Sequence, residues 1–434
     1  MENLPRTLAP ALLRVSSQFP VLMLTGPRQV GKTTLLEMCA RLELPGSAAP
    51  SGAGKPAEAA SRQAVFAPPR AYVTLDDLDA RALARRDPAL FLQTWPAPLI
   101  IDEVQYAPEL LSAIKIAVDR ERRNGMYWLT GSQKFDLMRG IGESLAGRVA
   151  VMDLLGLSQA EQDGRADRSA PFLPTPEWIA SARANARSKS LQQVFEQIWL
   201  GAYPRLHLLG PSGRDVFYRS YVQTYLQRDV QDVLRVTDQT AFHRFLAAAA
   251  ARTGQLCNYA GLARDADVDN KTAKAWLSVL ETSGVVYRLQ PDFRNRTQRI
   301  VKAPKLYFLD TGLAAYLTKW PDAAALEAGH MSGAMLETWA VAEVLKSYWH
   351  HGLEAPLHYY RDTHQQEVDL LIESADTLFP VEIKKTASPA LQAARSFPAI
   401  AKLGMRVGPG AVLCFADRDL PLSREVAAIP LRYL

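Results

Sequence analysis

Short apolar runs separated by longer helix-forming segments are the first regular pattern along the chain. Between residues 20 and about 155, runs such as VLML and PLII alternate with segments that carry no helix breaker. Short, fully apolar runs are typical of strands buried on both faces, and strand–helix alternation is typical of a parallel sheet covered by helices. We therefore predict an α/β fold here, with strands at residues 21–24, 72–75, 99–101, 127–129 and 149–152.

The apolar spacing becomes helical after residue 190. From residue 191 to about 252, apolar side chains recur three or four positions apart, and Tyr218, Tyr221 and Tyr225 form an aromatic stripe. Such stripes belong to protein cores far more often than to ligand sites, so we predict a helical lid that packs onto the α/β domain. Arg228 either reaches a ligand from this lid or forms a salt bridge with a neighbour.

Residues 240–318 have the pattern of a winged helix-turn-helix. Two helical segments are separated by a polar turn at residues 267–269, and two strand-like runs, 285–289 and 305–309, follow as a hairpin. The loop between these runs suits contacts with DNA phosphates, but winged helices also bind proteins, and solvated charges on a loop are common. The basic residues of this loop are Arg294, Arg296, Arg299 and Lys302.

The first predicted strand leads into the glycine-rich stretch GPRQVGKTT, followed by helix formers. Glycines at this junction let successive backbone N–H groups face one anion at a helix N-terminus, where Lys32 reaches the β- and γ-phosphates and Thr33 ligates Mg²⁺. The alternative is a strand-to-helix turn with a solvated lysine. The candidate nucleotide-binding residues are Gly26, Pro27, Arg28, Gln29, Val30, Gly31, Lys32, Thr33 and Thr34.

Acidic and polar residues follow the next predicted strands. Asp102 is expected to contact Mg²⁺ through its water shell and Glu103 to polarise the attacking water. Ser132 or Gln133, after the strand at 127–129, is expected to sense the γ-phosphate or position that water, or to form a plain polar turn. Arg148 either stabilises transition-state charge, in its own subunit or across an interface, or is a surface arginine.

Together these stretches resemble the motif series of bacterial and archaeal AAA-type ATPases that carry a C-terminal domain of poorly defined function. The resemblance continues through YLQRDV and EVDL, and it implies ATP binding with Mg²⁺, ATP hydrolysis and a C-terminal module similar to restriction-endonuclease-like proteins. Residues 44–70 depart from it as an Ala-, Pro-, Gly- and Ser-rich insertion, expected to be a flexible loop. The expected domains are an ATPase core (1–160), a helical lid and linker (161–238), a winged helix-turn-helix (239–320) and a nuclease-like α/β domain (321–434).

A second set of acidic residues lies near the C-terminus. Period-2 alternation predicts strands in QEVDLLIE and FPVEIKKT, and if these pair as a hairpin, Asp369, Glu382 and Lys384 meet at one edge, with Glu337 of an amphipathic helix above them. Two carboxylates and a lysine there would hold Mg²⁺ and activate water against a phosphodiester, with Asp369 and Glu382 as metal ligands. Strands with Glu and Lys on a solvated face are common, so a purely structural role stays open.

Composition narrows the class of protein but does not indicate a function. Apolar residues make up 48% and charged residues 22% of the 434 residues, as in ordinary globular proteins, and a net charge of +5 is weak evidence for nucleic-acid binding. Since there is no long apolar run and no secretory signal, we expect a cytoplasmic protein without a membrane span. Three widely spaced cysteines predict a reducing compartment and no zinc site.

Three functions remain open at this point. The first is an ATPase switch or motor whose C-terminal region binds nucleic acid or a protein; the second is an ATP-regulated, metal-dependent nuclease. The third is a docking protein that binds nucleotide without hydrolysing it. A homo-oligomer that assembles with ATP is expected if Arg148 acts across an interface.

Overall fold

The computed structural model describes residues 4–42, 70–131, 144–226, 238–291, 303–362 and 365–434. The chain divides into two units, Leu8–Leu154 and a second that combines Met1–Thr7 with Leu155–Leu434. The segments predicted as a lid, a helix-turn-helix module and a C-terminal α/β domain all lie in the second unit. No helix in the described ranges combines the length and apolarity needed to cross a membrane.

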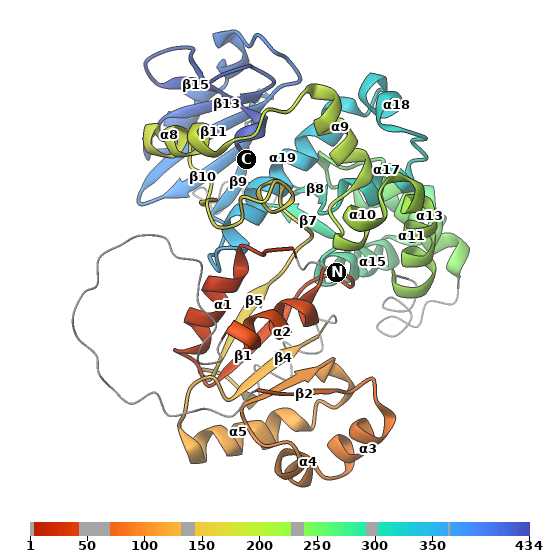
Figure 1. Ribbon diagram of the computed structural model, residues 1–434. Coiled ribbons are helices and arrows are strands. Elements are labelled where there is room, and N and C mark those ends of the chain that lie inside the picture. Colours follow the sequence, from red (N-terminus) through yellow and green to blue (C-terminus); the bar gives the residue numbers. More distant parts are fainter. Residues whose placement is uncertain (1–3, 43–69, 132–143, 227–237, 292–302, 363–364) are drawn as a thin grey trace, which may run out of the picture. The chain divides into compact units, whose positions relative to one another are not determined.

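A parallel sheet organises the unit Leu8–Leu154 (Figure 1). Its strand order is β2-β3-β4-β1-β5, and every neighbouring pair is parallel. This confirms the predicted α/β fold, with each strand within a residue or two of its expected place. The strands are β1 (Val21–Thr25), β2 (Ala71–Thr74), β3 (Leu99–Asp102), β4 (Tyr127–Thr130) and β5 (Val149–Asp153).

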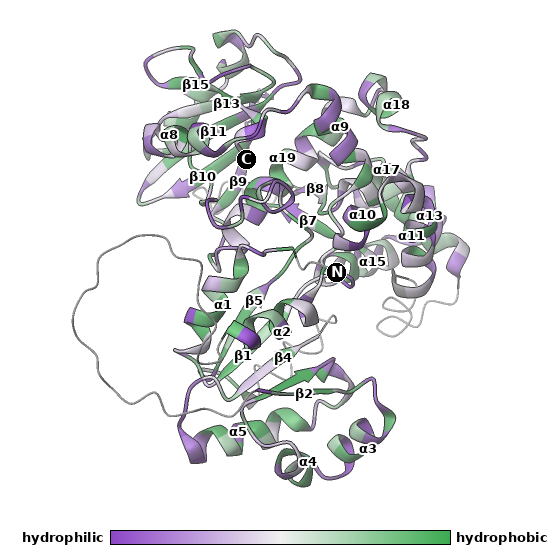
Figure 2. Ribbon diagram, in the orientation of Figure 1, coloured by the Kyte–Doolittle hydropathy of each residue, from purple (hydrophilic) through white to green (hydrophobic). Residues whose placement is uncertain are grey.

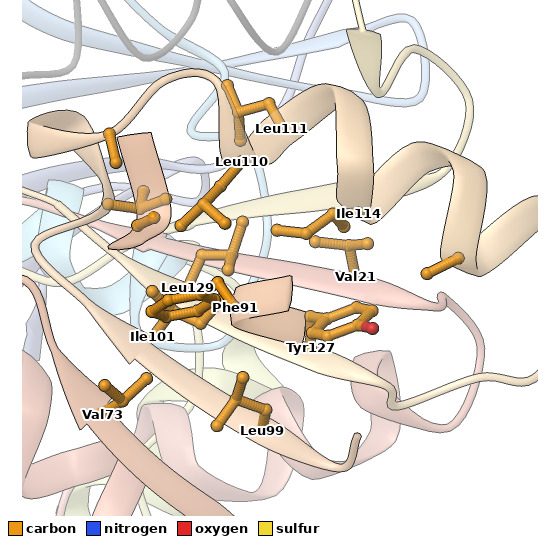
Figure 3. Packing of buried hydrophobic residues seen from close by; sticks show 14 of the residues in the cluster. Val21, Val73, Phe91, Leu99, Ile101, Leu110, Leu111, Ile114, Tyr127 and Leu129 are labelled. Carbon is orange, nitrogen blue, oxygen red and sulfur yellow. The ribbon is translucent and has the colours of Figure 1, made fainter. Parts of the chain in front are cut away.

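Helices bury both faces of this sheet. Because alternate strand residues point to opposite faces, Val21, Ile101 and Leu129 share one apolar cluster with Phe91 and other helix residues (Figure 3). On the opposite face, the indole Nε1 of Trp128 donates to Ser16 Oγ at 2.8 Å. Burial on both faces explains why the strands read as continuous apolar runs. The helices are α1 (Leu8–Ser16), α2 (Lys32–Leu42), α3 (Leu78–Arg86), α4 (Pro88–Thr94), the 3₁₀ turn η1 (Val104–Tyr106) and α5 (Leu110–Glu121).

The second unit begins with a helical region, where the aromatic stripe lies in a core. Tyr218 and Tyr221 are buried against Tyr203 and Phe217, and Tyr218 stacks on Tyr316 of the same unit. The predicted core role is thus confirmed for Tyr218 and Tyr221, and packing onto the ATPase stays a prediction. The elements are α7 (Gln159–Gln162), α8 (Pro176–Asn185), α9 (Leu191–Leu200), α10 (Pro204–Leu209), η2 (Pro211–Gly213), α11 (Arg214–Tyr221) and η3 (Val222–Leu226).

Three helices and a small antiparallel sheet follow. Asp267 ends one helix with a left-handed backbone (φ 60°), and Asp269 begins the next by accepting from the N–H groups of Lys271 and Thr272. Gly284 (φ 69°) follows that helix, as its sequence position predicted. The elements are α13 (Gln239–Ala250), β6 (Gln255–Leu256), α14 (Tyr259–Ala266), α15 (Asn270–Thr282), β7 (Val286–Leu289) and β8 (Lys305–Phe308), with sheet order β6-β8-β7.

The C-terminal region is a mixed sheet with helices on it. Strands β10 (Glu367–Ser374) and β11 (Thr377–Ile383) form the predicted antiparallel hairpin, and β11 continues into a parallel pair with β13. The sheet order is β14-β15-β13-β11-β10-β9, with β12 beside β11. The other strands are β9 (Leu357–Arg361), β12 (Arg406–Val407), β13 (Gly410–Cys414), β14 (Leu420–Pro421) and β15 (Val426–Pro430).

One expectation about the helices of this region is wrong. Helix α19 (Ser332–Trp349) is not amphipathic, because every residue from Thr338 to Lys346 is buried. It packs against α9, α17, α18, β8 and β11, which cover it on several sides, whereas α3 and α5 alternate purple and green along their length in Figure 2. The remaining elements are α17 (Thr311–Leu317), α18 (Ala323–Ala328), η4 (Leu391–Ala394), η5 (Phe397–Leu403) and η6 (Leu431–Tyr433).

Candidate functional site

The glycine-rich stretch forms a loop between β1 and α2. Three of its residues have a positive φ: Gly26 (138°), Gln29 (64°) and Gly31 (91°). A Cβ added at Gly26 would lie 2.0 Å from the carbonyl oxygen of Leu154, so this position is restricted to glycine by both conformation and space. The loop therefore has the curled backbone that a phosphate cradle requires.

Lys32 begins α2 and lies across this loop. Its ammonium donates to the carbonyl oxygens of Gly26 (3.0 Å) and Pro27 (2.9 Å), and the residue is only 7% exposed. A buried ammonium held at the N-terminus of a helix places a positive charge where an anion is favoured. The alternative of a solvated lysine on a plain turn is not supported by this burial.

Asp102 is the centre of a hydrogen-bonded group at the carboxyl ends of the strands. It is buried, and both of its carboxylate oxygens accept from Thr33 Oγ1 at 3.1 Å. Thr130 Oγ1 also donates to it, and the Tyr72 hydroxyl donates to Oδ2 at 2.9 Å. Burial and the Asp102 charge raise the pKa of Tyr72 above its usual range, so Tyr72 is a fixed donor.

The structure thus brings together the two residues predicted to hold Mg²⁺. The Thr33 hydroxyl and the Asp102 carboxylate are hard oxygen ligands in direct contact, which fits a Mg²⁺ ion bound through one of them directly and the other through water. Sequence reasoning missed Tyr72, because only the adjacency of β2 and β3 carries its side chain to Asp102.

Glu103 follows Asp102 in a left-handed backbone conformation (φ 56°). Its N–H donates to Thr130 Oγ1 at 3.2 Å, and its carboxylate accepts from the side-chain amide of Gln105. A left-handed non-glycine residue costs backbone strain, and such residues concentrate at functional sites. Gln105 was visible in the IDEVQ stretch, but its role as a positioning partner was not predicted.

Arg148 is not brought to this group. Its guanidinium forms a two-bond ion pair with Asp119 of α5 (Nε–Oδ1 2.6 Å, Nη2–Oδ2 3.0 Å) and also donates to the Ala146 carbonyl. The hydrogen bond from Arg148 lowers the pKa of Asp119, and the same hydrogen bond raises the pKa of Arg148. Ser132, Gln133 and Arg228 lie outside the described residues, as do Arg294, Arg296, Arg299 and Lys302.

A second polar group lies on the β10–β11 hairpin. Asp369 Oδ2 accepts from the backbone N–H of Ile383 at 2.9 Å, and the Lys384 ammonium lies 2.5 Å from Glu382 Oε1 and 3.9 Å from Asp369 Oδ2. Asp369, Glu382 and Lys384 therefore share one small region, because the antiparallel register places the two strands' residues opposite each other.

Glu337 reaches the same region from α19, through a lysine that the sequence did not single out. Lys305 of β8 lies 2.9 Å from Glu337 Oε1, 2.5 Å from Glu367 Oε1 and 3.9 Å from Asp369 Oδ1. The Tyr307 hydroxyl donates to Glu337 at 2.6 Å. We call the four carboxylates Glu337, Glu367, Asp369 and Glu382 the acidic cluster.

Protonation in the acidic cluster is shifted by burial. Burial and the neighbouring Asp369 raise the pKa of Glu382 to about 7, although Lys384 opposes this. The pKa of Glu337 is raised by the same two causes, in the same order. Burial lowers the pKa of Lys305, but Glu337, Asp369 and Glu367 outweigh it and raise the pKa above its usual range.

One atom of the acidic cluster lacks a partner. Glu382 Oε2 is buried and accepts no hydrogen bond from the described residues. Over the same ranges, however, no three His, Cys, Asp or Glu side chains are arranged as a metal-ion site. Asp369 and Glu382, which both lie near the Lys384 ammonium, are the two carboxylates that could bind a divalent ion whose coordination would be completed by water.

Comparison with protein families matches three stretches of the chain. Residues 18–162 match a family described as an AAA domain, residues 191–324 a domain of unknown function (DUF8612), and residues 332–434 another (DUF4143). These matches confirm the resemblance in its coarser form, an AAA-type ATPase domain joined to a C-terminal region of unknown function.

Two curated relatives match along nearly the whole chain. They are the uncharacterized proteins Mb2031c of Mycobacterium bovis and Rv2008c of Mycobacterium tuberculosis. Each is 29% identical over 427 residues, covering 98% of this chain and 83% of the relative.

Similar solved structures include AMPPCP-bound DnaA from Aquifex aeolicus (15% identity, TM-score 0.26, 63% of this chain and 85% of that one). The Bacillus subtilis DNA clamp loader delta protein is another (11% identity, TM-score 0.24, 63% of this chain and 87% of that one). TM-scores of this size do not establish a common overall fold.

Proposed function

We propose that the protein is a Mg²⁺-dependent ATPase that acts as a switch or motor, coupling its nucleotide state to a C-terminal module that binds nucleic acid or protein. The observation that carries the proposal is the joint geometry of the loop and strand ends, where buried Lys32 lies across the glycine loop and Thr33 bonds to Asp102. A plain structural turn has no need of a buried ammonium followed by a hydroxyl that bonds to a buried carboxylate, since burying either charge is costly.

Each residue has a distinct role in this proposal. The loop N–H groups and Lys32 bind the phosphates, and Thr33 and Asp102 hold Mg²⁺, which supplies charge neutralisation on the phosphates. Glu103, fixed by Gln105 and Thr130, orients and polarises the attacking water. In the same proposal Ser132 or Gln133 senses the γ-phosphate or positions the attacking water.

Arg148 requires a change of partner before it can act, because its guanidinium is engaged by Asp119. We propose that it stabilises transition-state charge after leaving Asp119, in its own subunit or in a neighbouring one. Sedimentation with saturating ATP separates these cases: ATP-driven assembly supports action across an interface, and a monomer contradicts it.

The test of the ATPase is phosphate release with Mg²⁺-ATP by the wild type and by Lys32→Ala. Lys402→Ala is a suitable control, since Lys402 lies at the surface beside Asp362, far from the loop in sequence and in the other unit. We expect turnover to be lost in Lys32→Ala alone, with both variants folded by circular dichroism. Turnover retained in Lys32→Ala would refute the proposal, and tight ATP binding without release would indicate a nucleotide-dependent docking protein.

The module that the nucleotide controls is proposed to include a winged helix-turn-helix. The support is the order of α13, β6, α14, α15, β7 and β8 with a three-stranded antiparallel sheet, which is typical of that motif. Phosphate release that rises on addition of DNA would support contacts through Arg294, Arg296, Arg299 and Lys302. Release indifferent to DNA would favour a protein partner.

A metal-dependent nuclease is the second candidate, favoured by the unpartnered oxygen of Glu382 beside Asp369. In this proposal Asp369 and Glu382 hold the ion, and Lys384 activates or stabilises the nucleophile. Glu337 contacts Lys305 beside this pair. Incubation with DNA and Mg²⁺, with Asp369→Ala as the control, tests it. Equal cleavage, or none, by the two proteins would dispose of this candidate.

A further inference from the structure

We propose that Lys305 is the built-in cation of the acidic cluster and that it competes with divalent metal ions for Asp369. Lysine is almost never fully buried unless it is paired. Lys305 is only 3% exposed, and it comes from β8, outside the hairpin that carries most of the cluster. It thus supplies from a separate element the positive charge that a metal ion would otherwise supply.

The two carboxylate oxygens of Asp369 have different partners, and Lys305 lies beside the one that a metal ion would need. Asp369 Oδ2 already accepts from the Ile383 N–H and faces Lys384, so Oδ1 is the oxygen left for a further cation. Lys305 faces that Oδ1 at 3.9 Å, and it also holds Glu337 Oε1. A metal ion shared by Asp369 and Glu382 would therefore approach the ammonium of Lys305.

Charge leads to the same conclusion. The acidic cluster contributes four negative charges when fully ionised, and Lys305, Lys384 and Arg361, which lies 3.4 Å from Glu367, contribute three positive ones. A dication added to these groups would leave an excess of positive charge in a largely buried region, where like charges repel strongly. Removing the Lys305 ammonium takes away one positive charge and vacates the space beside Asp369 Oδ1, so that a dication can be accommodated.

Lys305 also ties separate elements together. Its ammonium joins β8 to α19 through Glu337 and to β10 through Glu367. The neighbouring Tyr307 on β8 donates to the same Glu337, which reinforces the attachment. The inference concerns ion binding and holds whether or not the cluster cleaves nucleic acid.

The experiment is a Mn²⁺ titration of the full-length chain, followed by electron paramagnetic resonance of free Mn²⁺, without nucleotide. We expect Lys305→Met to bind one Mn²⁺ at least about tenfold more tightly than the wild type, a change typical of altered surroundings of a metal site. The gain should vanish in Lys305→Met/Asp369→Asn. Lys385→Met is the matched control, because Lys385 pairs with Glu327, outside the cluster.

Thermal unfolding with and without Mn²⁺ gives a second readout. Lys305→Met should melt below the wild type and regain stability with Mn²⁺, whereas Lys385→Met should respond to Mn²⁺ as the wild type does. Should Lys305→Met fail to fold, Lys305→Gln keeps a polar group beside Glu337, and the same tenfold gain is expected.

Three results would overturn the proposal. They are equal Mn²⁺ affinity in the wild type and a folded Lys305 variant, a gain that survives Asp369→Asn, and tight binding by the wild type that Asp369→Asn abolishes. The third result is measured on the wild type and Asp369→Asn, so it can be obtained even if both Lys305 variants are insoluble. Weak Mn²⁺ binding by the wild type supports the inference.

Discussion

Replacing Gly26 by alanine tests whether the loop geometry is what binds the phosphates. The new Cβ would lie 2.0 Å from the Leu154 carbonyl oxygen, against an ordinary contact of about 3.4 Å or more. Leu154 cannot move aside cheaply, because its N–H donates to the Thr25 carbonyl at 2.9 Å and its side chain is fully buried. The loop itself must therefore shift.

The cost has two parts. A backbone conformation that residues other than glycine rarely adopt costs about 1–3 kcal/mol, and overpacking a buried contact costs about 1–3 kcal/mol more. If the loop escapes this strain by leaving its curled form, restoring that form on binding costs at least about 2 kcal/mol. This corresponds to nucleotide affinity lower by about 25-fold or more.

Gly147→Ala is the matched control for this substitution. Gly147 also has a positive φ (75°) in the same unit, but nothing lies within 4 Å of an added Cβ, so it carries conformational strain without the clash. Titration with a fluorescent ATP analogue should show weakened binding for Gly26→Ala and little change for Gly147→Ala. Binding by Gly26→Ala within twofold of the wild type would refute the reasoning.

The remaining predictions concern buried charges in the second unit. Glu161→Gln should lower its free energy of unfolding by about 3–5 kcal/mol in urea, because Arg6 (3.1 Å) and His350 (3.3 Å) then lose their anionic partner; a loss below about 1 kcal/mol contradicts this. Burial raises the pKa of Glu161, but Arg6 and His350 lower it well below its usual range. The stability it contributes is therefore present above the unfolded pKa near about 4.3 and is lost as pH falls further, so acid unfolding should be steeper in the wild type than in Glu161→Gln. Glu382 behaves oppositely: burial and Asp369 raise its pKa to about 7, so its stabilisation is present at low pH and is lost as pH rises through 7. Glu382→Gln should therefore unfold at a higher temperature than the wild type at pH 8 but not at pH 5, and identical pH profiles would rule this out.

Much of the first unit follows from contiguous residues. The five strands and the glycine loop were predictable because burial on both faces demands apolar runs, and because the curl of the loop depends on its own glycines, Gly26 and Gly31. Asp102 and Glu103 were visible because they directly follow an apolar strand. The bounds of helix α15 were equally local, because Asp269 marks where it begins and Gly284 follows its end.

Contacts between side chains that are distant in the sequence could not be predicted from the sequence. The contact of Tyr72 with Asp102 depends on the strand order β2-β3, which no local pattern specifies. The burial of residues 338–346 of α19 depends on neighbours more than a hundred residues away in the chain, such as α9.

Lys305 shows the same limit in the candidate metal region. The sequence determined the hairpin with Asp369 and Glu382, since period-2 alternation and strand pairing are local properties. It did not determine that a lysine from β8 lies among these carboxylates. Long-range packing determines which side chains surround a buried carboxylate. Whether a lysine or a metal ion balances the charge of that carboxylate therefore depends on the tertiary structure.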